Sequence, residues 1–305
     1  MEAWGFCLFI GFWGGKQGEI DADGARGAMS SVYWDEKRAV AQREFRYEFP
    51  ERTLAGKTVI VAGGTGGLGA ATTMLLAREG ARRIVGYRSD RAKAERLRSA
   101  VAEQSGAKIE LVEGELGEAR VRAKYLEAAA GAGPRLELAG VAIFPGDPAR
   151  VAWEQLDREA LGASIDANYT GPVLLAKELG EAIERSEAGG SVVLLATMQA
   201  LAAFPGSLNY APAKAALAHA ARILAQQWNR VRVNVVAPGA TTAGMAAASV
   251  QSGKYDRHVA SGAIARFGRA EDVAHAVRFF LEPDNYITGQ TVTVDGGLTL
   301  RRDRG

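Results

Sequence analysis

The sequence contains few of the residues that build disulfide bridges and metal sites. Its 305 residues include a single cysteine, Cys7, so the chain can form neither an internal disulfide nor a thiolate metal site. The three histidines, His219, His258 and His275, share no spacing typical of metal ligands. We therefore predict that the protein binds no metal, and the scarcity of cysteine favours a reducing, cytoplasmic location.

Long apolar stretches and an excess of one charge are also missing. No stretch approaches the ~20 apolar residues that cross a bilayer. The apolar segment Trp4–Trp13 is shorter, and Glu2 stands where an export signal carries positive charge. A formal net charge of +2 is too small to favour nucleic acid or a membrane surface as a partner. These absences predict a globular protein that binds neither.

The chain divides into an N-terminal extension, residues 1–53, and a single globular domain, residues 54–305. Residues 14–31 are rich in Gly, Ala, Ser and charge and lack periodicity, so we expect them to be flexible. The charged and aromatic segment Tyr33–Phe49 is compatible with one helix followed by an extended arm. The extension could serve as an arm across a neighbouring subunit, or it could be plain disorder.

From Leu54 onward, short apolar runs alternate with helical patterns. Ser191–Thr197 is almost uninterruptedly apolar, which is typical of a strand buried on both faces of a parallel sheet. The regular alternation predicts an α/β fold with a doubly wound parallel sheet, the Rossmann fold. The predicted strands are 58–62, 83–87, 108–112, 139–144, 191–197, 231–236 and 291–294, and the predicted helices are 70–78, one ending near 103, 119–130, 161–185, 210–228 and 270–281.

Glycines gather between the first predicted strand and its helix. Gly63, Gly67 and Gly69 permit a tight turn and let the backbone approach a pyrophosphate closely. The helix that follows points its free amide hydrogens and the positive end of its dipole toward the phosphate charge. The run predicts a dinucleotide site; the alternative is a glycine-rich turn that only packs the helix on the sheet.

The end of the second strand indicates which dinucleotide binds. An acidic residue there would hold the ribose 2′-hydroxyl of NAD, whereas an arginine accommodates the 2′-phosphate of NADP. Ile84–Ser89 has no acid at this turn and places Arg88 just after Tyr87. A guanidinium can pair with a phosphate through two parallel hydrogen bonds. We therefore predict NADP(H) as the cofactor; the alternative is that Arg88 is a solvated residue at the start of a basic helix.

Tyr210 and Lys214 form a pair suited to proton transfer. They lie four residues apart at the start of a predicted helix, and so on one face of it. A nearby ammonium favours a phenolate over a phenol, and a tyrosine so placed can give a proton to a carbonyl oxygen or take one from an alcohol. Such pairs are common on helices, and this one gains weight because it follows a buried strand in a dinucleotide-binding fold.

Six features in the same order resemble the short-chain dehydrogenase/reductase family, and within it the 3-oxoacyl-[acyl-carrier-protein] reductases. The resemblance extends from about Leu54 to Leu298. It rests on the glycines Gly63, Gly67 and Gly69, on Asn168 in Asp166–Gly171, on the hydroxyl residue Thr197, on Tyr210 and Lys214, on Asn234 with Pro238–Gly239, and on the closing segments Arg266–Ala274, Tyr286–Gln290 and Val294–Gly297.

The resemblance implies a role for each matching residue. Tyr210 would be the general acid in the reduction of a carbonyl, and Thr197 would hydrogen-bond the substrate oxygen. Lys214 would hold the nicotinamide ribose, and Asn168 would anchor a water that relays protons to it. Contacts with the cofactor are expected from Gly63, Thr65, Gly67, Leu68, Gly69, Tyr87, Arg88, Glu115, Leu116, Gly146, Tyr210, Lys214, Pro238, Gly239, Thr241 and Thr242.

The match fails at three places. Ala62 stands where the family has a threonine, and Glu115 stands where it has an aspartate. The family's Asn-Asn-Ala-Gly turn is Ile143-Phe-Pro-Gly146 here, so only the glycine is kept. These departures raise the alternative of a catalytically weak dinucleotide-binding protein that acts as a sensor or assembly partner.

The resemblance implies a ketone or a 3-oxoacyl thioester as the substrate, with a sugar or polyol as the alternative. The segment between Gly239 and Phe267 is expected to supply a substrate lid, but its residues name no substrate. Met198, Leu201, Phe204 and Met245 would form an apolar pocket wall, or else ordinary core packing. Assembly as a homodimer or homotetramer is implied through the helical segments 161–185 and 210–228.

Overall fold

The computed structural model of the chain describes residues 34–130, 138–147 and 151–301. The chain divides into two compact units, Met1–Phe49 and Pro50–Gly305. The described part of the first unit holds helix α1 (Glu36–Arg43), which Asp35 caps by accepting a hydrogen bond from the Arg38 amide at 2.9 Å. The predicted flexibility of residues 14–31 lies outside the described residues.

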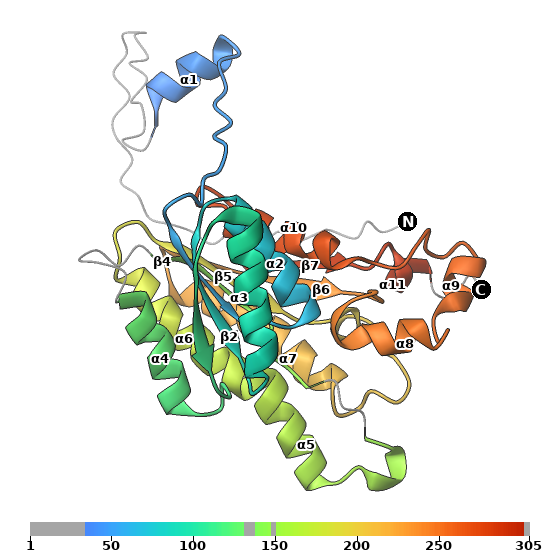
Figure 1. Cartoon of the computed structure of the whole chain (residues 1–305). Helices are drawn as coiled ribbons and strands as arrows, with labels where there is room; N and C mark the ends of the chain where they lie inside the picture. The colour runs from blue at the N-terminus through green and yellow to red at the C-terminus, as the bar shows by residue number, and fades with distance from the viewer. Residues whose placement is uncertain (1–33, 131–137, 148–150, 302–305) are drawn as a thin grey trace, which may run out of the picture. The chain divides into compact units, whose positions relative to one another are not determined.

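Seven strands of the second unit form one parallel sheet (Figure 1). Their order is β3-β2-β1-β4-β5-β6-β7, and every neighbouring pair is parallel. The order reverses between β1 and β4, so the predicted doubly wound sheet is confirmed. The strands are β1 (Thr58–Ala62), β2 (Arg82–Tyr87), β3 (Ile109–Glu113), β4 (Leu138–Ile143), β5 (Gly190–Leu195), β6 (Val231–Pro238) and β7 (Thr291–Val294).

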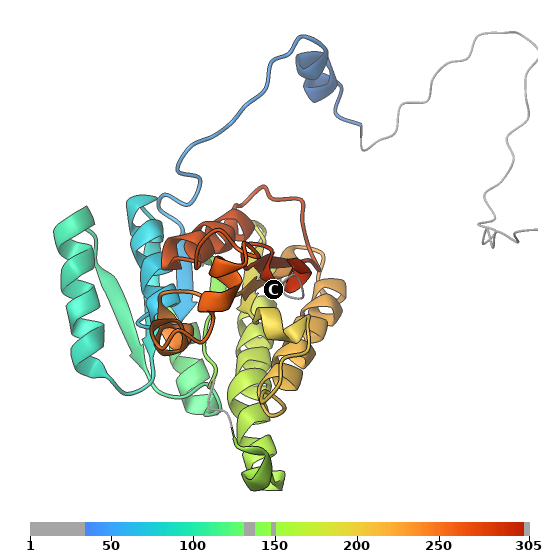
Figure 2. The same cartoon turned by 90° about the vertical axis from the view of Figure 1, so that its right-hand side faces the viewer.

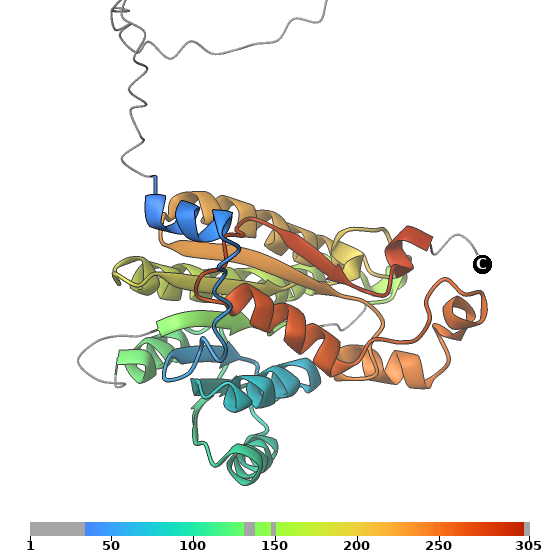
Figure 3. The ribbon, with the colours of Figure 1, turned by 90° about the horizontal axis from the view of Figure 1, so that it is seen from above.

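Helices cover both faces of the sheet. Helices α2 (Gly67–Arg78), α3 (Arg91–Ser105) and α10 (Ala270–Leu281) share buried clusters with one face, and α4 (Ala119–Ala130), α6 (Gly171–Glu184) and α7 (Ala211–Gln227) with the other. Figure 3 shows α10 beside α2, and Leu76 and Phe280 from these two helices belong to one cluster. Every residue of β5 is buried because helices lie on both of its faces.

The helix predicted over 161–185 is helical throughout 158–184 but contains a π-helical segment. Helix α5 (Arg158–Ile165) leads into a π-turn, η2 (Asp166–Thr170), and then into α6, so that α5 and α6 follow one another in the lower part of Figure 2. Asp157 starts α5 by accepting a hydrogen bond from the Ala160 amide at 2.8 Å. A π-turn inserts one residue into a helix and is often found at functional sites.

The end of strand β5 also differs from the prediction. Strand β5 ends at Leu195 rather than at Thr197, because the Thr197 side chain caps a 3₁₀ turn, η3 (Met198–Ala200). The segment expected to form a lid folds into a 3₁₀ turn, η4 (Gly244–Ala246), and two short helices, α8 (Ala247–Gln251) and α9 (Asp256–Ala260). A last short helix, α11 (Leu298–Arg301), follows β7.

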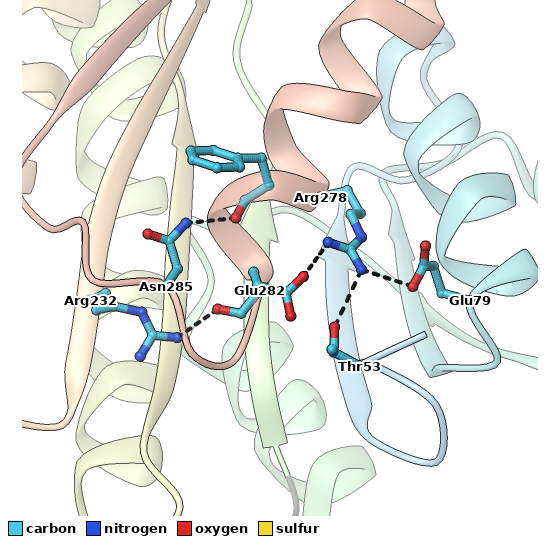
Figure 4. Close-up of polar contacts among 7 residues, drawn as sticks. Thr53, Glu79, Arg232, Arg278, Glu282 and Asn285 are labelled. Atoms are coloured by element: carbon cyan, nitrogen blue, oxygen red, sulfur yellow. Dashed lines mark hydrogen bonds and ion pairs between the residues drawn. The ribbon is translucent and has the colours of Figure 1, made fainter. Parts of the chain in front are cut away.

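Arg278 ties three segments of this unit together (Figure 4). From α10, its guanidinium donates hydrogen bonds to Glu79 at the end of α2 (3.0 Å) and to the Thr53 hydroxyl (3.3 Å), and it pairs with Glu282. The side chains of Arg278, Glu79 and Glu282 are each less than one quarter exposed. Loss of the guanidinium would therefore leave two partly buried carboxylates without their cation.

We expect Arg278→Met to lower the free energy of unfolding by about 1–3 kcal/mol, because the partners left behind lose charge-assisted hydrogen bonds. Denaturant unfolding would measure the difference from the parent. Arg120→Met is the matched control, since Arg120 is largely exposed and its pair with Glu118 should change the value by at most about 0.5 kcal/mol. Equal losses in the two variants would contradict the role of the Arg278 network.

Candidate active site

The glycine run forms the turn between β1 and α2. Gly63 has a φ of +73°, a left-handed conformation that other residues rarely adopt. A side chain at Gly69 would collide with the Gly63 carbonyl, so the start of α2 lies directly against the turn. Within the described residues, no side chain caps the N-terminus of α2. The first amides of the helix are therefore available to an anionic ligand.

A cleft of about 730 Å³ opens at this turn. It lies where the strand order reverses, which is where doubly wound sheets bind ligands. The structure brings ten of the residues predicted to contact the cofactor into its lining, namely Gly63, Thr65, Gly67, Leu68, Gly69, Tyr87, Arg88, Glu115, Leu116 and Gly146.

The other predicted cofactor residues do not line this cleft. Pro238 ends β6 and Gly239 follows it, and the buried Thr241 hydroxyl donates to the Ala243 carbonyl at 2.9 Å. Thr242 donates to the Gly268 carbonyl at 3.3 Å. Their contacts with a cofactor remain a prediction.

Several lining residues were missed from the sequence. Gly244 comes from the segment expected to form a lid, next to Met245, which the sequence had suggested for a pocket wall. Gly244 packs so closely on Gly67 that a side chain at Gly67 would collide with it. Gly171, at the start of α6, would bring a Cβ to within 3.1 Å of the Leu116 side chain. In the sequence, the only indication of these positions was that Gly244 and Gly171 are small residues. Only the packing of segments that are distant in the chain shows what they contact.

A pair of opposite charges stands at the end of β2 and β3. The Arg88 guanidinium lies 3.9 Å from the Glu115 carboxylate, and both side chains are mostly exposed. Next to them, the Tyr87 hydroxyl donates to Glu113 at 2.8 Å. Burial and the neighbouring Glu113 raise the pKa of Tyr87. This end of the cleft therefore presents the Arg88 guanidinium as a group that could bind a ligand. The Glu115 carboxylate already lies close to that guanidinium.

Lys214 is fully buried at the base of the site. Its Nζ donates to the Leu195 carbonyl at 2.9 Å and to the Pro145 carbonyl at 3.3 Å. Burial lowers the pKa of Lys214 to about 7, because an ammonium loses hydration inside the protein. Tyr210 caps the N-terminus of α7, and its carbonyl accepts a hydrogen bond from the Lys214 amide at 3.1 Å. The structure thus places the two residues one helical turn apart, as predicted.

Asn168 is fully buried in the π-turn. Its Nδ2 donates to the Asp147 carbonyl at 2.9 Å, and its Oδ1 accepts from the Asp147 amide at 3.1 Å. A Cβ at Gly146 would lie 2.6 Å from Asn168 Oδ1 and 2.9 Å from Lys214 Nζ. A side chain at position 146 would therefore displace Asn168 or Lys214, which gives a physical reason for the glycine that this turn keeps.

Thr197 lies just after β5, on the same edge of the sheet as Tyr210. It is buried, and its Oγ1 accepts a hydrogen bond from the Gln199 amide at 3.3 Å. Helix α7 packs against η3, the turn that Thr197 starts. The connections that leave β4 and β5 therefore bring Asn168, Thr197, Tyr210 and Lys214 to one edge of the sheet, beside the cleft.

Two absences hold for the part of the chain that the structure describes. It contains no group of three or more His, Cys, Asp and Glu side chains placed to hold a metal ion. Over the same residues, none of the helices combines the length and hydrophobicity that crossing a bilayer requires.

Comparison with known proteins places this arrangement in context. Residues 62–299 match the family model described as enoyl-(acyl carrier protein) reductase. An uncharacterized oxidoreductase of Methylorubrum extorquens is 31% identical over 263 residues, which cover 80% of this chain and 98% of the relative. Glucose 1-dehydrogenase of Gluconobacter oxydans is 29% identical over 259 residues, covering 82% and 94%. A short-chain type dehydrogenase/reductase from Mycobacterium ulcerans has a similar structure, with a TM-score of 0.75, 25% identity, and coverage of 81% and 91%.

The buried amine of Lys214 predicts a pH-dependent stability. The unfolded chain keeps this proton up to the ordinary pKa of 10.5, whereas the folded protein releases it above about 7. Between these values the unfolded chain binds more protons, so the free energy of unfolding rises with pH. From pH 7 to pH 9 we expect Lys214 to contribute a gain of about 2 kcal/mol.

Denaturant unfolding of the parent and of Lys214→Met, without cofactor, at both pH values measures this contribution. The variant should lack the gain, because methionine fills similar space and carries no titratable group. A rise with pH that is the same in both proteins would contradict the low pKa of Lys214.

Proposed function

The chain belongs to the short-chain dehydrogenase/reductase family, and on that basis we propose that it uses NADPH to reduce a ketone or 3-oxoacyl carbonyl to an alcohol. Members of this family are oxidoreductases that interconvert alcohols and carbonyls with a nicotinamide dinucleotide. The observation that carries the finer proposal is the buried Tyr210–Lys214 pair on the edge of the sheet beside a glycine-lined cleft.

The cleft fits a dinucleotide. Gly67 and Gly69 stand where any side chain would collide with neighbouring backbone, so the turn lies open to a pyrophosphate. The unpaired amides at the start of α2 would bind its charge, and Leu116 and Glu115 would border the adenosine half. When bound, the cofactor supplies the hydride; the residues of the chain hold it and move the proton.

The proton would come from Tyr210. Its phenolic hydroxyl would donate to the carbonyl oxygen of the substrate, which the Thr197 hydroxyl would also hydrogen-bond. Lys214 would favour the phenolate that remains, and its pKa of about 7 lets it exchange a proton near neutral pH. Asn168 would anchor the water that returns a proton to Lys214. Each of these roles rests on the family resemblance together with the observed placement.

Apolar side chains favour a ketone or acyl substrate. Met198 is buried beside the lid, Phe204 packs on the same cluster, and Leu201 and Met245 are each about half exposed in the connections after β5 and β6. A sugar or polyol is the second candidate substrate, supported by the likeness to a protein named glucose 1-dehydrogenase. The third candidate is a protein that binds a dinucleotide but turns over no substrate. The observation that supports it is the altered turn Ile143–Gly146.

We also propose assembly as a homodimer or homotetramer in the cytoplasm. Leu161 and Ile165 on α5 and Ile223 on α7 are large apolar side chains that are 39–50% exposed. They lie on the helical segments through which the resemblance implies assembly. We further propose that the catalytic domain begins near Leu54, which is fully buried against Val59 and Val61 of β1.

Replacing the phenol tests the reaction. We expect Tyr210→Phe to lower kcat by roughly 10²- to 10⁴-fold, the usual contribution of a positioned general acid, while the cofactor still binds. NADPH oxidation, followed with a panel of ketones, 3-oxoacyl thioesters and sugars, measures both proteins. Tyr286→Phe is the control, because Tyr286 is fully exposed. Full activity in Tyr210→Phe would overturn the assignment, and cofactor binding without turnover in the parent would favour the inactive module.

Reversing the charge at Arg88 tests the cofactor. We expect Arg88→Asp to lower the preference for NADPH over NADH, as a ratio of kcat/KM, by roughly 10- to 100-fold, because the 2′-phosphate would lose its guanidinium and meet a carboxylate. The control is Arg91→Asp, an equally exposed residue at the start of α3 that does not line the cleft. An unchanged preference in Arg88→Asp would rule out this assignment.

A further inference from the structure

Ser164 is a buried hydroxyl residue on α5 that the proposed mechanism does not use. A serine inside a helix commonly returns its hydrogen bond to a carbonyl of its own helix. Ser164 instead donates across to the carbonyl of Asn209, 45 residues later, at 2.6 Å. The bond is enclosed in the protein, so a loss of either partner would leave a buried polar group unsatisfied.

The same hydroxyl also meets Asn168. The Nδ2 of Asn168 donates to Ser164 Oγ at 3.3 Å and to the Ser164 carbonyl at 3.0 Å. Its carboxamide additionally holds the backbone of Asp147, the residue after the altered turn. A continuous path of hydrogen bonds therefore runs from Asp147 through Asn168 and Ser164 to Asn209.

The path ends one peptide before Tyr210. Asn209 is itself buried, and Tyr210 follows it at the N-terminus of α7. The amides of Tyr210 and Ala211 donate to the Ser207 carbonyl at 3.2 and 2.9 Å, so Ser207 to Ala211 form one turn. Because Ser164 holds this turn at Asn209, it restrains where the phenol of Tyr210 can lie.

We propose that Ser164 is a positioning residue: through Asn209 it sets Tyr210 relative to Asn168 and the Asp147 turn. The catalytic consequence rests on the proposed function, whereas the mechanical coupling does not. A phenol displaced from its productive position donates its proton less efficiently, while the glycine turn that would hold the pyrophosphate lies outside this path of hydrogen bonds. The loss is therefore expected in kcat and not in cofactor affinity.

Ser164→Ala and Ser191→Ala form a matched pair. Ser191 on β5 is also fully buried, and its hydroxyl donates to a backbone carbonyl, that of Phe280, at 2.7 Å. Both variants lose a buried hydrogen bond from a serine hydroxyl to a backbone carbonyl, and Ser164→Ala also loses the longer bond that Asn168 donates to the hydroxyl. Only Ser164 connects to Tyr210. We expect Ser164→Ala to lower kcat roughly tenfold or more, with an unchanged cofactor dissociation constant, because small misplacements of reacting groups are costly. Ser191→Ala should lose similar thermal stability and keep kcat within about twofold of the parent.

Amide hydrogen exchange measures the coupling between Ser164 and the turn before Tyr210, and it requires no substrate. In Ser164→Ala, the amides of Tyr210 and Ala211 should exchange faster than in the parent and in Ser191→Ala. Unchanged exchange there overturns the proposal, whatever the activity of the parent. Faster exchange with an unchanged kcat overturns the catalytic part. A parent that turns over no substrate counts against the proposed function alone, since the exchange measurement still decides the coupling.

Discussion

The amine of Lys214 lies wholly inside the protein, held by two backbone carbonyls at the ends of neighbouring strands. Leu195 ends β5, and Pro145 follows β4, so one side chain joins the two connections that surround the site. A buried amine costs free energy unless its donors are satisfied, and here both acceptors belong to rigid backbone. The position of the turn after β4 and the low pKa of Lys214 are thus two results of one packing arrangement.

That arrangement leaves no room beside the amine. Gly146 lies against both Lys214 and Asn168, and any side chain there would displace one of them. Phe144, by contrast, is only partly buried: it packs at the border of the core, on the α2 and α10 side of the sheet, and Pro145 follows it. The altered turn therefore keeps the one residue that the buried amine requires and varies where side chains can be accommodated.

Hydrogen bonds of Asn168 and Ser164 extend this restraint on position to neighbouring segments of the chain. Asn168 in the π-turn holds the backbone of Asp147, near the start of the same connection, and Ser164 on α5 holds that of Asn209 in the connection after β5. The segment after β6 also borders the cleft, where Gly244 lies on Gly67. Two of these hydrogen bonds join the connections after β4 and β5: Lys214 donates to the Pro145 carbonyl, and Ser164 donates to the Asn209 carbonyl.

The sequence by itself determined the fold and the kinds of residue at the site. Strand–helix alternation and the apolar run at β5 predicted the parallel sheet, because a strand covered on both faces must be apolar along its whole length. The glycine turn and the Tyr210–Lys214 pair were readable because they depend on neighbours within one turn of helix or loop.

Tertiary structure alone decided what these residues meet. The contact of Gly244 with Gly67 and the bond from Ser164 to Asn209 join segments whose separation in the chain hides their contact. The π-turn at Asp166–Thr170 lies within a stretch that the sequence pattern predicted as one regular helix. Nor does the sequence show that Lys214 is buried, since its burial depends on the position of the turn after β4 in the folded protein. Local periodicity reports the neighbours along a chain, whereas packing across connections is set only when the sheet brings the carboxyl ends of its strands together.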